Sequence, residues 1–156
     1  MKIRESVAWI FLALLTIVLA SGSALATLGG SVDSVETDRK MLSAVRRSVT
    51  TPAGPYTVHE IAYSGTTVRE YVSPDGIVFA IAWSGNRSPD LMTLLGTYAG
   101  EYQSALQNAP HRPGVRHSSI ATDDVVVQTW GPVGQLQGRA YAPSLIPTGV
   151  TIDEIK

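Results

Sequence analysis

Three successive strand-like stretches in the middle of the chain leave few folds open to it. Each is rich in β-branched and aromatic residues, and they span Tyr56–Tyr63, Thr67–Val72 and Ile77–Trp83. Short turn sequences connect them, first Ser64-Gly65-Thr66 and then Ser73-Pro74-Asp75-Gly76, in which proline presets one corner and glycine accepts a positive φ. Connections this short join antiparallel neighbours, so the sequence predicts a three-stranded meander.

The register of the first hairpin decides which side chains share a face, because a slip of one residue turns a strand over. A three-residue loop would set Glu60 opposite Glu70, an unfavourable pair of like charges. A four-residue loop sets Glu60 beside Tyr71 and within diagonal reach of Arg69, and we prefer it. One face then carries Arg69, Tyr71, Ile77, Phe79, Ile81 and Trp83. The other carries the smaller Val68, Val72, Val78, Ala80 and Ala82, against which a helix has room to pack.

A helix and two further strands are expected after the meander. Ser88 is the expected N-cap, with Pro89 and Asp90 in the first turn, and the helix ends near Asn108. Its apolar stripe consists of Leu91, Leu94, Leu95, Tyr98, Tyr102 and Leu106. The strands are expected at about Val125–Trp130 and Leu136–Tyr141, joined by the turn Gly131-Pro132-Val133-Gly134. We expect residues 143–150 to be extended and draped over the body.

The amino-terminal part is predicted to hold a short helix that begins at Asp33 or Ser34 and extends its apolar stripe to Val49. The proline-containing stretch Thr50–Pro55 is expected to be a linker. Together these elements predict one α+β domain over residues 27–156. It contains an antiparallel sheet of about five strands, one long helix between strands 3 and 4, and a short N-terminal helix.

Residues 1–26 have the organisation of a secretory signal peptide. Lys2 and Arg4 precede an apolar stretch from Val7 to Ala20, and the small residues of Ala24-Leu25-Ala26 predict cleavage between Ala26 and Thr27. The apolar stretch is shorter than the roughly 20 residues that a membrane-spanning helix needs. We therefore expect a periplasmic or secreted protein without a stable membrane anchor after cleavage.

The composition excludes several classes of function. The chain of 156 residues has no cysteine, which rules out disulfides, thiolate metal sites and thiol redox chemistry. Its formal net charge of −1 offers no basic face for nucleic acid. Among catalytic patterns, Gly-x-Ser-x-Gly and phosphate-binding glycine loops are absent from the sequence, and we expect no catalytic residue, no metal site and no cofactor.

Two groups of polar residues are candidates for binding. Strand residues of the first group would line a concave sheet face and take a ligand: Glu60, Arg69, Tyr71, Trp83, Arg139 and Tyr141. The alternative interpretation of these residues is a set of cross-strand ion pairs and core aromatic residues. The second group is Arg112 and Arg116, whose fork-shaped donors suit an anion in the loop between His111 and His117. The alternative there is a solvated basic loop.

Several motifs in order resemble a known family, the exported bacterial domain of unknown function 2844 (DUF2844). The amino-terminal motifs are Leu28-Gly29-Gly30, Ser34-Val35-Glu36, Asp38-Arg39 and Tyr56-Thr57-Val58-His59-Glu60. The later ones are Val68-Arg69-Glu70-Tyr71-Val72, Val78-Phe79-Ala80, Ala82-Trp83, Pro89-Asp90-Leu91, Leu94-Leu95-Gly96, Gly138-Arg139-Ala140-Tyr141, Pro143 and Leu145–Val150. The resemblance covers nearly all of the chain after the signal. It implies an exported protein of Gram-negative bacteria and transfers no catalytic residue.

The expected function is non-catalytic binding of a small ligand or of an envelope protein. A structural or assembly accessory protein of the cell envelope, recognised through an exposed strand edge, is the alternative. A hydrolase is the third hypothesis, and it requires His59, His111 or His117 within hydrogen-bond reach of a nucleophile.

Overall fold

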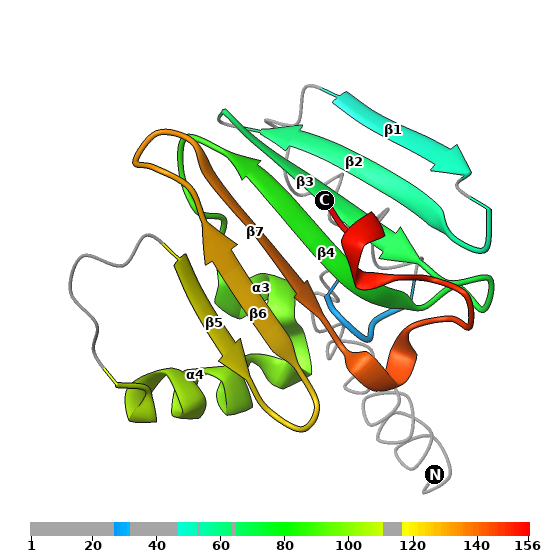
Figure 1. The fold of residues 1–156 in the computed structure, drawn as a ribbon. Helices are drawn as coiled ribbons and strands as arrows, with labels where there is room; N and C mark the ends of the chain where they lie inside the picture. Colours follow the sequence, from blue (N-terminus) through cyan, green and yellow to red (C-terminus); the bar gives the residue numbers. More distant parts are fainter. Residues whose placement is uncertain (1–26, 32–46, 53, 64, 111–116) are drawn as a thin grey trace, which may run out of the picture.

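The computed structural model describes residues 27–31, 47–52, 54–63, 65–110 and 117–156. They contain a single antiparallel sheet, and other segments pack against both of its faces (Figure 1). The described sheet has seven strands in the order β1-β2-β3-β4-β7-β6-β5. Their bounds are β1 Arg47–Pro52, β2 Thr57–Tyr63, β3 Thr66–Val72, β4 Val78–Gly85, β5 His117–Ala121, β6 Val126–Trp130 and β7 Leu136–Tyr141. The predicted α+β class and antiparallel sheet are confirmed.

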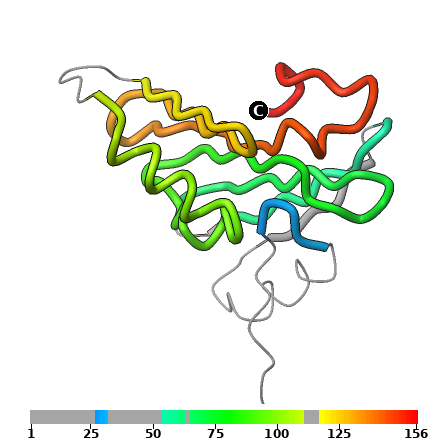
Figure 2. Tube along the Cα trace, turned by 90° about the horizontal axis from the view of Figure 1, so that it is seen from below, coloured from blue at the N-terminus to red at the C-terminus, as the bar shows by residue number. Residues whose placement is uncertain are grey.

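The molecule has three layers, which Figure 2 shows with the sheet in the middle. A helical segment lies against one face and consists of α3 (Leu91–Leu95), the 3₁₀ turn η1 (Gly96–Tyr98) and α4 (Ala99–Asn108). Residues 27–31 lie on this same side, which we call the helix side. The C-terminal segment, residues 143–156, covers part of the other face and contains η2 (Pro143–Leu145) and η3 (Ile152–Glu154). We call that face the tail side.

The helical segment follows the third predicted strand, as expected, but its cap and its continuity differ from the prediction. Asp90, not Ser88, is the N-cap, and its carboxylate accepts hydrogen bonds from the backbone N–H groups of Met92 and Thr93 at 3.1 and 3.4 Å. A third bond, from the Thr93 hydroxyl at 2.7 Å, lowers the pKa of Asp90 most. Gly96, with φ of 53°, interrupts the helix before α4.

Two described strands lie where the sequence predicted none. β1 occupies residues expected to end the first helix and begin a linker, and β5 begins at His117, the last residue of an expected loop. Both strands lie at an edge of the described sheet, where the terminal Pro52 of β1 is tolerated because an edge leaves some N–H groups unpaired. The rest of the predicted N-terminal helix falls outside the described residues.

The first hairpin has neither of the loop lengths weighed from the sequence. Tyr63 pairs with Thr66, so the turn contains two residues, and Gly65 adopts the φ of 80° that such a tight turn requires. This register sets Glu60 directly opposite Arg69. The second predicted turn is confirmed, because Gly76 donates its N–H to the Ser73 carbonyl at 2.9 Å with φ of 78°.

The pairing of β3 with β4 also corrects the predicted faces of the meander, because a β-bulge shifts the register between Tyr71 and Val72. Arg69 pairs with Ala82 and Tyr71 with Ala80, so both alanines lie on the tail side with these larger residues. Ile81 and Trp83 lie instead on the helix side. The helix-side core contains Leu28, Val68, Val72, Val78, Ile81, Trp83, Leu95, Tyr102, Ile120, Val125, Val127, Ala140 and Ala142. The tail-side core contains Tyr56, Tyr71, Phe79, Ala80, Ala82, Tyr141 and Ile155.

Candidate functional site

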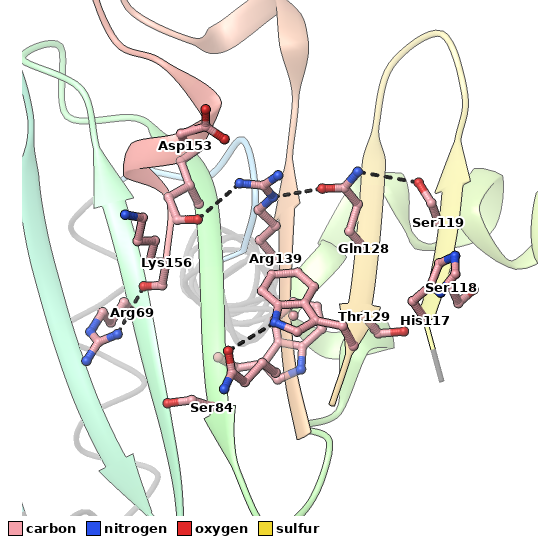
Figure 3. Close-up of a pocket in the computed structure, with 15 residues that line it drawn as sticks. Arg69, Ser84, His117, Ser118, Ser119, Gln128, Thr129, Arg139, Asp153 and Lys156 are labelled. Carbon is pink, nitrogen blue, oxygen red and sulfur yellow. Dashed lines mark hydrogen bonds between the residues drawn. The ribbon is translucent and has the colours of Figure 1, made fainter. Parts of the chain in front are cut away.

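A groove of about 940 Å³ crosses the tail side of the sheet, between the C-terminal segment and β5 (Figure 3). Side chains from β3, β4, β5, β6 and β7 line it together with residues of the tail. Alternate residues of a strand point to the same face, so each strand contributes every second side chain to the groove. The antiparallel pairing then aligns these side chains in rows that run across the strands.

The first row contains a chain of hydrogen bonds centred on Arg139. Gln128 lies between Ser119 and Arg139 in the register, donating to the Ser119 hydroxyl at 3.5 Å and accepting from Nε of Arg139 at 2.8 Å. Nη1 of Arg139 donates to the carbonyl oxygens of Ile152 at 2.6 Å and Ile155 at 3.4 Å. Nη2 has no hydrogen-bond partner among the described residues. The guanidinium is thus held in place while part of it is still available.

The second row lies beside the first and brings two flat rings into the groove. His117, which is exposed, pairs with the half-buried Trp130, and Trp130 pairs with Gln137. The indole N–H of Trp130 donates to Oε1 of Gln137 at 3.0 Å. The Arg139 guanidinium lies 5.8 Å from the centre of the Trp130 ring, within the range of a cation–π contact. These bonds fix the orientation of Trp130 relative to the arginine.

The other wall of the groove is the end of the chain, held by residues of β3. Tyr71 both donates to the Lys156 carbonyl and accepts from the Lys156 N–H, each at 2.9 Å. Nη1 of Arg69 donates to the same carbonyl at 3.0 Å, while its Nε pairs with Glu60 at 2.8 Å. Ile155 is fully buried in the tail-side core. The segment is therefore anchored by both polar and apolar contacts.

A second anchor of the tail involves Glu154 and shifts two pKa values. Burial is the main cause of the raised pKa of Tyr56, and its hydrogen bond to Glu154 at 3.1 Å adds to it. The pKa of Glu154 is lowered chiefly by the backbone N–H of Thr151, and then by the Thr151 hydroxyl and Tyr56. Both Thr151 groups donate at 2.9 Å, which completes a capping box around η3.

One protein-family model matches nearly the whole of the chain after the predicted signal peptide. The family model described as a protein of unknown function, DUF2844, matches residues 24–155. The chain belongs to the DUF2844 family. No curated protein and no solved structure matches it. The resemblance drawn from the sequence is confirmed, and the family carries no assigned activity.

The DUF2844 fold brings most of the predicted ligand-binding residues to one face. Glu60, Arg69, Tyr71, Arg139 and Tyr141 all lie on the tail side. Tyr71 and Tyr141 are buried there, and the two arginines contact the C-terminal segment. Trp83 belongs to the lining, but its side chain is packed in the helix-side core at 3% exposure. Arg112 and Arg116 fall outside the described residues.

Sequence reasoning missed His117, Ser119, Gln128 and Trp130 as site residues. For Gln128 and Trp130 a signal existed, because a turn over residues 131–136 would have aligned Gln128 with Arg139 and Trp130 with Gln137. His117 and Ser119 carried no such signal, since β5 itself was not predicted. β5 nevertheless forms one side of the groove.

Metal-ligating side chains and histidines are dispersed over the described part of this DUF2844 protein. Residues 27–31, 47–52, 54–63, 65–110 and 117–156 contain no group of three or more metal-ligating side chains. His59 pairs with Glu70 on the helix side, whereas His117 lies on the tail side, so these two histidines cannot share a site. None of the described helices is long and apolar enough to cross a membrane.

Proposed function

We propose that this DUF2844 protein is an exported, non-catalytic binding domain that holds a small hydrophilic ligand in the groove. One observation carries the proposal. Arg139 is held by Gln128 and by the tail, lies 5.8 Å from the centre of the Trp130 ring, and still has Nη2 without a partner among the described residues. A donor fixed in this way loses little conformational entropy when a ligand binds, which favours binding.

Export to the periplasm or the exterior is supported by how the chain begins after the predicted cleavage site. Leu28 is 1% exposed, and its N–H donates to the Leu94 carbonyl at 2.9 Å. Gly29 donates to the Val78 carbonyl at 2.8 Å, and Val78 donates back to Gly30 at 3.0 Å. Cleavage between Ala26 and Thr27 would leave all of these contacts in the mature domain.

A binding role rather than catalysis is supported by how the polar groups of the groove are used. Gln128 donates to the hydroxyl of Ser119, and no hydrogen bond joins this serine to a histidine among the described residues. Arg139 and Arg69 donate to main-chain oxygens of the tail. Nucleophilic catalysis needs a hydroxyl beside a general base, whereas these contacts orient donors and acceptors toward a bound molecule.

The test is native mass spectrometry of the mature protein, Thr27 to Lys156, purified from the periplasm. We expect a discrete small adduct that is lost in Arg139→Ala and retained in Arg87→Ala, a matched change at an exposed arginine outside the groove. Circular dichroism of both variants checks that the fold persists. A bare protein in every preparation, or an adduct that survives Arg139→Ala in a folded variant, would overturn the proposal.

The edge strand β5 favours one second candidate, an accessory protein of the cell envelope. β5 is the last strand of the described sheet, only Ile120 is buried in it, and it contains neither proline nor lysine. Edges of this kind accept an added strand from a partner. In that case one envelope protein, and no small adduct, would co-purify with the wild type and equally with Arg139→Ala.

A further inference from the structure

We infer that the ligand of the groove is an acidic saccharide, a hydroxyl-rich chain that carries a carboxylate. The inference rests on the proposed function and names its ligand class. The groove combines a fixed arginine, an ammonium group, flat rings, and side-chain hydroxyls and amides on one face of a sheet (Figure 3).

The charge of the lining favours an anionic ligand. Among the side chains of the lining, Arg69, Arg139 and Lys156 are positively charged, and Asp153 supplies one carboxylate. Glu60 forms an ion pair with Nε of Arg69 and offsets part of its charge. The Lys156 ammonium and Nη2 of Arg139 have no partner among the described residues. Guanidinium and ammonium donors bind carboxylates through charge-assisted hydrogen bonds, which are shorter and stronger than neutral ones.

Main-chain oxygens of the C-terminal segment, rather than a small anion, accept hydrogen bonds from both arginines. Ala82 separates Arg69 from Arg139 in the register, which places the two arginines two strands, or roughly 10 Å, apart. Main-chain oxygens of Lys156 and Ile155 already accept one bond from each arginine. A ligand therefore contacts the two arginines separately. It must extend along the groove to reach the remaining side chains of the lining.

The remaining side chains of the lining suit hydroxyl groups and sugar rings. Hydroxyls of Ser84 and Ser119 and amides of Gln128 and Gln137 each donate and accept hydrogen bonds, as sugar hydroxyls do. Trp130 is half-buried with its ring oriented by Gln137, and the exposed His117 lies next to it. Such rings offer an apolar surface to the C–H face of a sugar while their polar atoms bind elsewhere.

The same lining disfavours an acidic peptide. β6 and β7 are interior strands that pair on both sides, so their backbone cannot accept an added strand from a peptide. The aliphatic and aromatic side chains other than Trp130 in the lining are Ile155 and Trp83, which are 0% and 3% exposed. Neither Ile155 nor Trp83 therefore offers an exposed side chain against which a peptide side chain could pack.

The experiment compares two trisaccharides of equal length with the mature protein, trigalacturonate and the neutral galactotriose. Binding is followed by calorimetry and by tryptophan fluorescence, to which only Trp83 and Trp130 contribute after signal cleavage. We expect trigalacturonate to bind at least tenfold more tightly than galactotriose. Lys156→Ala, which keeps the main-chain bonds of the tail, should weaken trigalacturonate at least threefold, and Trp130→Phe should remove most of the fluorescence change. Arg87→Ala should bind like the wild type.

Failure of this inference is distinguishable from failure of the proposed function. Equal binding of both trisaccharides, or binding of an acidic tripeptide of three glutamates in place of trigalacturonate, would overturn the saccharide class. The periplasmic adduct and its loss in Arg139→Ala would then still support a binding domain. Trigalacturonate binding that Lys156→Ala and Trp130→Phe both leave unchanged would also overturn the inference, because it would locate the saccharide outside the groove.

Discussion

Because Gly138 has no side chain, the Trp83 ring can pack beside it in the helix-side core, beneath the groove. Gly138 pairs with Trp83, and a Cβ atom added at Gly138 would overlap the Trp83 ring and lie 2.7 Å from the Gln128 carbonyl oxygen. Trp83 is 3% exposed, and the close packing of the helix-side core limits how far its ring can shift. Its position therefore depends on the missing side chain of its neighbour.

We predict that Gly138→Ala lowers the free energy of unfolding by about 1–3 kcal/mol, the cost of overpacking a core. Urea unfolding followed by circular dichroism measures it. Gly100→Ala is the matched control, because no atom lies within 4 Å of a Cβ atom added there, in α4. That control should be neutral or stabilising by up to about 1 kcal/mol. Equal stability of the Gly138 variant and the wild type would contradict the prediction.

The hydrogen bond between Tyr56 and Glu154 makes the attachment of the C-terminal segment to the sheet depend on pH. The pKa of Glu154 is lowered from 4.5, so its contribution is complete above that value and is lost as the pH falls through the lowered pKa. The pKa of Tyr56 is raised from 10.0, so its contribution is complete below that value and is lost as the pH rises through the raised pKa.

We therefore predict that amide exchange in residues 151–156, corrected for intrinsic rates, is slowest between these two limits and faster at both ends. Hydrogen exchange with mass spectrometry on the C-terminal peptide measures it. Glu154→Gln removes the titrating carboxylate and should abolish the acid limb. An acid limb of the same size in that variant would show that another group causes it.

At the scale of elements, one side chain of the C-terminal segment, Ile155, is fully buried in the tail-side core. Ile152, three residues earlier, is 38% exposed. We predict that Ile155→Ala lowers the free energy of unfolding by about 2–4 kcal/mol, as expected for emptying a core site. Ile152→Ala should cost less than about 1 kcal/mol. Urea unfolding of both variants measures the difference, and similar losses would show that Ile155 does not anchor the tail.

How far each element could be predicted depended on whether its residues carry a local signal. The strands β2, β3, β4, β6 and β7 alternate or are rich in β-branched residues, and their turns contain glycine or proline, so all five were predicted. β5 reads His-Ser-Ser-Ile-Ala, and only Ile120 in it is buried. Such a strand forms because β6 offers it a partner, which no local pattern reveals. The change of the N-cap from Ser88 to Asp90 has a local cause, since the Asp90 carboxylate accepts three bonds at once.

At the scale of the whole molecule, the groove is made by long-range contacts. Arg69 and Tyr71 bind Lys156, more than 80 residues away in the sequence, and Arg139 binds the carbonyl of Ile152. The sequence indicated that these polar strand residues share a face, but not that the tail would cover part of it. No periodicity connects positions so far apart, because their contact depends on the complete sheet. The site is therefore a property of the whole DUF2844 domain rather than of any motif.

The residues that follow the predicted cleavage site are also attached to the sheet and the helical segment by long-range contacts. Leu28 is 1% exposed in the helix-side core, and residues 28–30 bond to Leu94 and Val78. We predict that a chain beginning at Thr27 unfolds in one cooperative transition, and that a chain beginning at Gly30 is less stable by about 2–4 kcal/mol because it loses a buried leucine.

Urea unfolding of the two chains measures that loss, and the intact mass of the exported protein locates the cleavage site. Leu28→Ala in the longer chain separates the side chain from the backbone bonds, and should account for most of the loss. Because signal peptidase and the folded core would select the same boundary, cleavage beyond Leu28 or equal stability of the two chains would each contradict a mature domain that begins at Thr27.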